Sequence, residues 1–244
     1  MFKKNVMKKL CVFLVLLLFH LTAISQFIVP EANHPVKDQI FINIGLEPEL
    51  VTTIGYVHLL NHRKNGNDFY LGGSLKSASL ILKNEAWRFN LIQGISFPVS
   101  HKWKSLLSNQ FYVAHNQNRA GSLTGLGFEL RGTIITSHNK WNKGIEGGWQ
   151  YTALTHIKHS SATRETYNDR YPDDSVTAAP VDGWYAATAS RFRLGFVLNK
   201  RLSTAIRAQF SIGSLLAIQK QKVALGFPYA QVPFYFNTQF SYGW

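Results

Sequence analysis

The sequence contains a single cysteine, Cys11, which lies in an apolar stretch near the N-terminus. A disulfide within the chain needs two thiols, and a cysteine-based metal site needs several, so the sequence excludes both. Because Cys11 lies inside the apolar stretch rather than just after it, we expect no lipoprotein cleavage site. Non-covalent contacts alone must therefore hold the fold together.

Long apolar runs are also lacking: beyond the first 25 residues, none reaches the roughly 18 residues that a membrane helix needs. The start of the chain has a basic segment, a short apolar segment and two small residues. These are Lys3, Lys4, Lys8 and Lys9, then residues 10–21, then Ala23 and Ser25. That order is typical of an export signal. We predict a signal peptide over residues 1–25 and a periplasmic lead-in over residues 26–38.

Acidic residues are scarce, with 13 Asp and Glu against 26 Lys and Arg, for a formal net charge of +13. A basic chain commonly binds nucleic acid, but this one carries an export signal and no nucleic-acid-binding motif, so we expect no such partner. Anionic headgroups are the nearer counter-charges. We therefore expect outer-membrane lipids and lipopolysaccharide to be partners.

What the chain has in abundance is alternation of apolar and polar residues, clearest in its last thirteen residues. The apolar positions are Phe234, Phe236, Phe240, Tyr242 and Trp244, and the polar or small ones between them are Asn237, Gln239, Ser241 and Gly243. A strand with this pattern has one apolar and one polar face. It resembles the C-terminal strand of outer-membrane β-barrels. That resemblance implies a place in the cell outer membrane, with Phe240, Tyr242 and Trp244 as the signal read by the barrel-assembly machinery.

Alternating segments of about 10 residues recur along the chain, as in membrane β-strands. We predict an all-β, antiparallel meander barrel of about 10 strands over residues 39–244, with 8 or 12 strands as alternatives. The segments 160–183 and 220–231 become extracellular loops, and short polar turns lie at the periplasmic end. The chain is similar to the small outer-membrane β-barrel proteins of Gram-negative bacteria. A soluble β-sandwich would not explain the apolar terminal strand.

The inward positions of the predicted strands carry charge. They are Arg88, Glu129, Arg131, Glu146, Arg191, Arg193 and Arg207. A barrel of this size has little open bore, and buried charges must be paired or solvated, so one hypothesis is a lumen closed by ion pairs. The alternative is a narrow, anion-preferring channel. Because arginine outnumbers glutamate, some guanidinium groups need water, loop carboxylates or a ligand.

One short motif indicates a different function. If the strand before residue 160 keeps the outward parity of Trp149 and Ile157, His159 and Ser161 both face the lipid. This His-x-Ser spacing resembles the lipid A 3-O-deacylases, which implies that His159 is a base and Ser161 a nucleophile. Ala162 departs from the asparagine of that family, and an acidic partner would have to come from Glu165 or a neighbouring loop.

These observations favour a monomeric, non-enzymatic barrel with a structural, transport-associated or partner-binding role and with its specificity in the external loops. It could belong to a larger outer-membrane protein complex. A lipid A or lipopolysaccharide hydrolase and a narrow anion channel are the alternatives. We expect no cofactor and no metal site, because His62, His101 and His138 lie on separate links without metal-ligand spacing.

Overall fold

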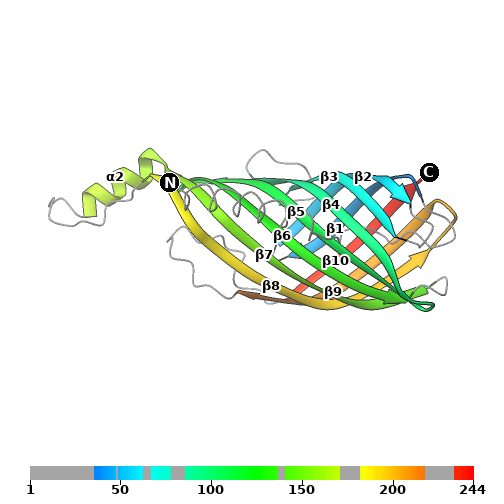
Figure 1. Cartoon of the computed structure of the whole chain (residues 1–244). Coiled ribbons are helices and arrows are strands. Elements are labelled where there is room, and N and C mark those ends of the chain that lie inside the picture. Colours follow the sequence, from blue (N-terminus) through cyan, green and yellow to red (C-terminus); the bar gives the residue numbers. More distant parts are fainter. Residues whose placement is uncertain are drawn as a thin grey trace, which may run out of the picture.

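The computed structural model describes residues 36–47, 49–62, 67–77, 86–136, 141–170, 182–217 and 234–244. They form one closed barrel in which each strand pairs with the next and β10 pairs with β1 (Figure 1). The strands are β1 (Asp38–Glu47), β2 (Glu49–His62), β3 (Asp68–Ser77), β4 (Ala86–Ser100), β5 (Trp103–Asn118), β6 (Gly121–Thr136), β7 (Trp141–His159), β8 (Gly183–Arg201), β9 (Ile206–Ala217) and β10 (Phe234–Gly243). The predicted antiparallel meander barrel of ten strands is confirmed. The predicted signal peptide and most of the lead-in lie outside the described residues.

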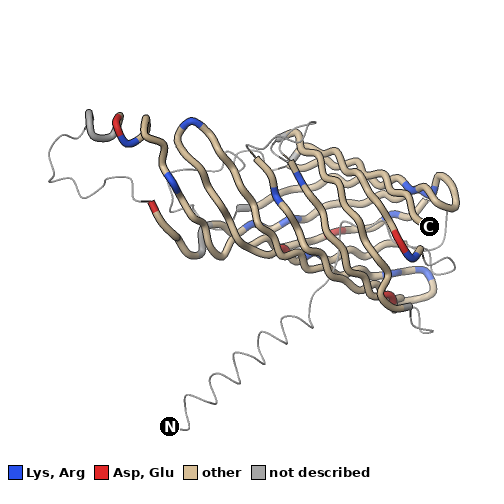
Figure 2. Tube along the Cα trace, turned by 90° about the horizontal axis from the view of Figure 1, so that it is seen from above, with Lys and Arg blue, Asp and Glu red and all other residues tan. Residues whose placement is uncertain are grey.

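Apolar side chains cover the outer wall of the barrel. On β1, Ile40, Ile42 and Ile44 are exposed, whereas Phe41 and Asn43 between them are buried in the lumen. The same alternation holds on β10, as its sequence predicts. Charged residues are few along the wall, which is mostly tan in Figure 2. A closed barrel with this apolar exterior is an outer-membrane β-barrel.

One helix, α2 (Ser161–Arg170), follows β7. None of the helices in the described residues is long and apolar enough to cross a membrane.

The two ends of the barrel differ. At the terminal end, β1 begins where β10 finishes, and Asp38 and Trp244 exchange backbone hydrogen bonds of 3.1 and 3.0 Å. At the opposite end, the loop end, α2 extends beyond the wall (Figure 1). Outer-membrane barrels keep short turns on the periplasmic side and longer loops outside. We therefore expect the loop end to face the exterior of the cell.

An irregularity in β7 reverses its alternation. Thr152 pairs with Gly127 and Leu154 with Leu126, so β7 has one residue more than β6 at Ala153. Beyond this β-bulge, Leu154 is 41% exposed and Ile157 only 2%. The prediction that Ile157 faces the lipid is wrong, because an extra residue moves every later side chain to the other face.

The lumen is filled near the terminal end. An apolar cluster lies inside the wall, made by Phe41, Val57, Tyr70, Ile92, Leu106, Ile135 and Val197. Gly55 leaves room for the ring of Phe41, since a Cβ there would lie 2.2 Å from that ring. A buried ion pair, Lys104 to Asp68 at 3.0 Å, lies at the same end. Together these side chains fill part of the lumen at the terminal end.

Candidate functional site: the charged lumen and its cavity

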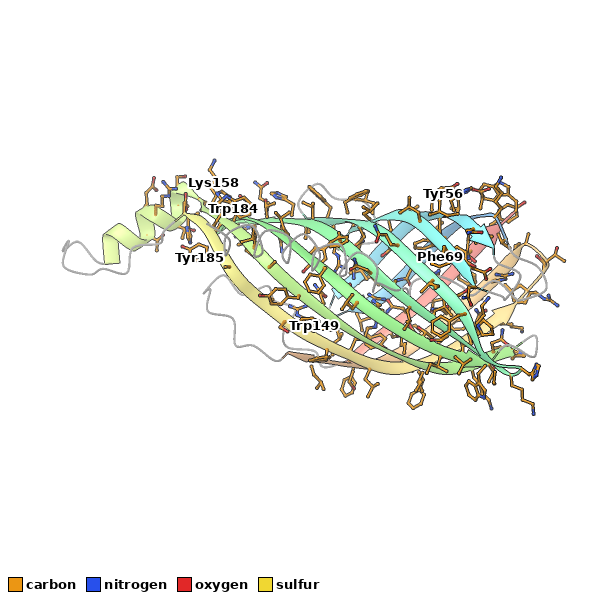
Figure 3. The ribbon with its side chains drawn as sticks, in the orientation of Figure 1. Tyr56, Phe69, Trp149, Lys158, Trp184 and Tyr185 are labelled. Carbon is orange, nitrogen blue, oxygen red and sulfur yellow. The ribbon has the colours of Figure 1, made fainter. Side chains whose placement is uncertain are left out.

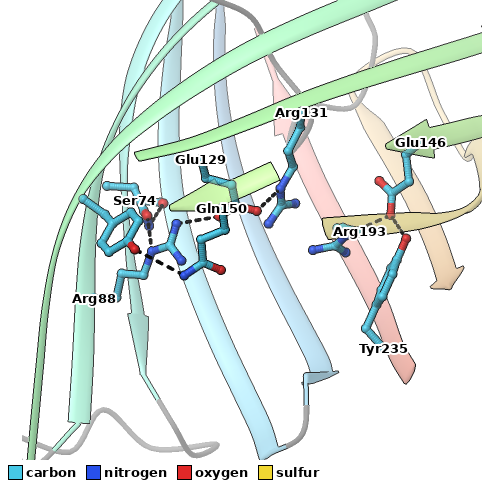
Figure 4. Close-up of polar contacts among 10 residues, drawn as sticks. Ser74, Arg88, Glu129, Arg131, Glu146, Gln150, Arg193 and Tyr235 are labelled. Carbon is cyan, nitrogen blue, oxygen red and sulfur yellow. Dashed lines mark hydrogen bonds and ion pairs between the residues drawn. The ribbon is translucent and has the colours of Figure 1, made fainter. Parts of the chain in front are cut away.

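The middle of the lumen holds a carboxylate between two arginines (Figure 4). Arg88 Nη2 donates to Glu129 Oε2 at 2.5 Å, and Arg131 Nε donates to Glu129 Oε1. All three side chains are largely buried. The Arg88 guanidinium also lies over the ring of Tyr112, 3.9 Å from its centroid. The two cations compensate the cost of burying the carboxylate.

A second carboxylate, Glu146, accepts hydrogen bonds from Arg193 Nε at 3.3 Å and from the Tyr235 hydroxyl at 2.6 Å. Arg193 lies over the Tyr235 ring, 3.7 Å from its centroid. Glu146 is therefore held by a cation and by a neutral donor, both also visible in Figure 4.

The sequence pattern found the charges but missed the two tyrosines. Tyr112 pairs with Gly127, which pairs with Thr152, and the Tyr112 hydroxyl reaches Thr152 Oγ1 at 2.7 Å. The Tyr112 phenol on β5 thus crosses over Gly127 on β6 and reaches Thr152 on β7. An inward glycine opposite an inward aromatic residue is the sequence signal that could have revealed this contact.

The structure places all seven predicted lumen charges on the inner side of the wall. It brings together Arg88, Glu129 and Arg131 in one group and Glu146 with Arg193 in another. Arg207 is buried on β9, and Arg191 lines a cavity.

That cavity occupies the half of the lumen toward the loop end and has a volume of about 140 Å³. Small residues create the space, namely Ala86, Ala114, Gly125, Gly148 and Ala189. Charged residues also line it, namely Lys76, Arg88, Arg191, Arg193 and Glu129. A cavity of about 10 Å³ lies deeper, beside Arg131, Glu146 and Gln239. Within the described residues, the lining of the larger cavity is thus strongly cationic.

The predicted catalytic pair lies elsewhere, at the loop end. His159 Nδ1 lies 2.8 Å from Asp182 Oδ1, which also accepts the His159 backbone N–H at 2.8 Å, and Arg164 binds the other carboxylate oxygen. The pKa of Asp182 falls to about 2 because it accepts these hydrogen bonds and lies beside the Arg164 guanidinium. Asp182, rather than Glu165, is the acidic neighbour of His159.

Ser161 does not complete this arrangement. It is the exposed first residue of α2, while its neighbour Ser160 caps the helix, accepting the Thr163 N–H at 3.2 Å. In the described part of the chain, no hydrogen bond joins His159 to Ser161. The prediction that both follow the outward parity of Trp149 is wrong, because the β-bulge at Ala153 reverses β7 before His159.

The residues of the predicted assembly signal lie on the outer wall. Phe240, Tyr242 and Trp244 are all exposed, and the rings of Tyr242 and Trp244 are 5.8 Å apart. Their role in assembly stays a prediction.

No family model matches this chain, and no curated protein matches it. Solved structures similar to it include a KdgM porin, with 10% sequence identity and a TM-score of 0.40 over 84% of this chain and 99% of the other. Another is a KdgM porin in complex with disordered oligogalacturonate, at 9% identity and the same TM-score and coverage. A NanC porin matches at 10% identity and a TM-score of 0.34, over 85% and 100% of the two chains. The chain's own closed, lipid-facing wall makes it a small outer-membrane β-barrel protein.

Proposed function

We propose that this protein is a non-enzymatic outer-membrane barrel that takes up a small anionic solute from the exterior into the cavity at the loop end of its lumen. The observation that carries the proposal is the lining of that cavity, where Lys76, Arg88, Arg191 and Arg193 accompany one carboxylate, Glu129. Glu129 binds Arg88 and Arg131, and Arg193 binds Glu146, so the cations in and beside the lining still outnumber these two carboxylates. An anion that enters the cavity therefore meets a positive electrostatic potential, which the low dielectric constant of the surrounding protein strengthens.

The size and shape of the cavity restrict the solute. A protein cavity of about 150 Å³ can hold a benzene molecule, so 140 Å³ suits a compact anion rather than a polymer segment. Guanidinium groups bind carboxylates and phosphates with paired hydrogen bonds. The rest of the lining combines alanine and glycine residues, which leave space, with polar side chains such as Tyr112, Gln150 and Thr152. A small carboxylate or phosphate ester fits these features.

The part of the lumen beyond the cavity favours binding of the anion over its steady passage through the barrel. The pairs Arg131 to Glu129 and Arg193 to Glu146 lie at the inner end of the cavity, where Glu129 and Arg193 are part of its lining, and the apolar cluster lies beyond them. Breaking a buried pair is costly, so this layer opposes free passage. A narrow anion channel is the second candidate, favoured by the small cavity beside Arg131 and Gln239 that continues the path.

Calorimetry on the full chain in a non-ionic detergent tests the proposal, with benzoate and inorganic phosphate as probes. Benzoate should bind and its neutral analogue benzamide should not. Arg191→Gln should weaken benzoate binding at least about tenfold, because a hydrogen bond to a charged group contributes about 1.5–3 kcal/mol. Lys143→Gln, an exposed position near the terminal end of β7, is the matched control and should bind like the wild type.

Two outcomes would contradict the proposal. Equal binding of benzoate and benzamide would show that charge plays no part, and equal affinity in wild type and Arg191→Gln would place the anion elsewhere. Large, steady, anion-selective currents in planar bilayers would favour the channel instead.

A further inference from the structure

A row of five side chains crosses the outer wall from β4 to β8. Trp87 pairs with His115, His115 with Thr124, Thr124 with His156, and His156 with Trp184. Neighbouring strands lie about 4.8 Å apart, so the row is about 19 Å long. We call it the Trp-His row. The sequence positions of its members are far apart, and only the register of five strands aligns them.

Side chains contact one another at three of the four steps of the Trp-His row, and the backbone register alone relates Thr124 to His156. The rings of Trp87 and His115 stack at 5.8 Å, His115 Nδ1 lies 3.2 Å from Thr124 Oγ1, and the rings of His156 and Trp184 are 5.0 Å apart. Trp184 is 58% exposed. The β-bulge at Ala153 is what places His156 here, because without it His156 would point into the lumen and Ile157 outward.

The Trp-His row separates an apolar surface from a polar one. One step toward the terminal end, the paired residues on the same face are Phe89, Val113, Leu126 and Leu154. One step toward the loop end, they are Gln117, Ser122 and Lys158. Lys158 is exposed, and Figure 3 shows it with Trp184 beside α2. This boundary is where the hydrocarbon of the bilayer gives way to headgroups.

The side chains at this boundary offer more kinds of ligand contact than the Trp and Tyr residues of an ordinary aromatic belt. Imidazole N–H groups, the Thr124 hydroxyl and the Lys158 ammonium offer hydrogen bonds and positive charge to phosphate oxygens. The indole faces of Trp87 and Trp184 suit the apolar faces of sugar rings. A phospholipid headgroup uses only the first of these features, whereas a phosphorylated saccharide uses both.

We propose that the Trp-His row and Lys158 form a binding site for the phosphorylated sugar headgroup of an outer-leaflet glycolipid of the lipopolysaccharide type. The site lies on the lipid-facing wall toward the loop end, which we expect to be the outer side. Trp87 and His115 also border the lumen cavity, whereas Thr124, His156, Lys158 and Trp184 are not among the residues that line it. Variants at His156 and Lys158 therefore test this site apart from what the cavity binds.

The test uses the full chain in a non-ionic, phosphate-free detergent, titrated with bisphosphorylated lipid A and followed by calorimetry. The double variant His156→Gln/Lys158→Gln should bind lipid A at least about tenfold more weakly, and Lys158→Gln alone about fivefold more weakly, as expected for one cation near a headgroup. The double variant His58→Gln/Lys143→Gln, at the terminal end, is the matched control and should keep wild-type affinity. Enzymatically dephosphorylated lipid A should bind the wild type as weakly as the double variant binds lipid A.

Lys158 is exposed, so Lys158→Gln gives a result even if the double variant does not fold. Unchanged affinity in Lys158→Gln would overturn the proposal. So would equally strong binding of phosphatidylglycerol, which would make the site a general phosphate contact without sugar recognition.

Discussion

Tyr235 on β10 reaches Glu146 on β7 by lying across two glycines of the strands between them. The register aligns Glu146 with Gly195, Gly195 with Gly213, and Gly213 with Tyr235. A Cβ at Gly195 would lie 2.1 Å from the Tyr235 hydroxyl oxygen, and one at Gly213 would lie 2.6 Å from Cε1 of the same ring. The paired glycines thus form a trough that lets the phenol donate to the buried carboxylate.

Filling this trough should destabilise the barrel. We expect Gly195→Val to displace Tyr235, break its hydrogen bond to Glu146 and lower the free energy of unfolding by about 2–4 kcal/mol, from overpacking and an unmade buried hydrogen bond. Urea unfolding in lipid vesicles measures the change. Gly147→Ala is the control, because a Cβ there meets only Arg193 O at 3.8 Å. Similar losses in both variants would show that the trough has no special role.

Removing the carboxylate between Arg88 and Arg131 should lower the free energy of unfolding further than Gly195→Val does. Glu129→Gln leaves two buried guanidinium groups without their counter-charge, and breaking a buried pair in this way costs about 3–5 kcal/mol. The unfolding midpoint in urea should fall accordingly, while the exposed Glu165→Gln on α2 should unfold like the wild type. A Glu129→Gln barrel as stable as the wild type would mean that water already solvates these arginines.

The sequence predicted the strands, their count and most of their faces, because a period of two in Ile40, Ile42 and Ile44 admits one orientation in a membrane barrel. The prediction of side-chain direction failed beyond Ala153, because the apolar and polar pattern of β7 does not indicate the extra residue there. The sequence also missed Tyr235, whose partner is set by the register of four strands. The contact of Asp182 with His159 was not predicted for a similar reason, since the sequence between them has no periodic pattern.

The contact between Asp182 and His159 should be lost at low pH, when the Asp182 carboxylate becomes protonated. The pKa of Asp182 is about 2 in the folded protein, against the usual 3.8. Because the folded value is the lower one, the stabilisation is complete above about pH 4 and is lost as the pH falls through 2. We expect the His159 amide to stay protected from hydrogen exchange from pH 7 to 4 and to lose protection toward pH 2. In Asp182→Ala it should exchange fast throughout; retained protection in that variant would contradict the assignment.

The terminal strand should be required for assembly. Phe240 lies between Ile42 and Ala208 in the register, and Trp244 exchanges backbone hydrogen bonds with Asp38, so residues 240–244 close the barrel. Deleting Phe240–Trp244 should leave the exported chain unfolded, degraded and missing from outer-membrane fractions. Tyr242→Phe, which keeps the aromatic ring, should assemble normally. A heat-modifiable barrel formed by the truncated chain would refute the assembly signal.

The His159 and Ser161 pair should carry no hydrolytic activity. A serine nucleophile needs a base within hydrogen-bond reach, about 2.6–3.2 Å, and the His159 ring is instead held by Asp182 while Ser161 begins a helix. Ala162 also replaces the asparagine of the lipid A 3-O-deacylases. Protein incubated with lipopolysaccharide should therefore release no fatty acid, measured by mass spectrometry against a deacylase as positive control. Release that vanishes in both His159→Ala and Ser161→Ala, with the barrel still folded, would make this protein an enzyme, because only a shared catalytic role explains the loss in both variants.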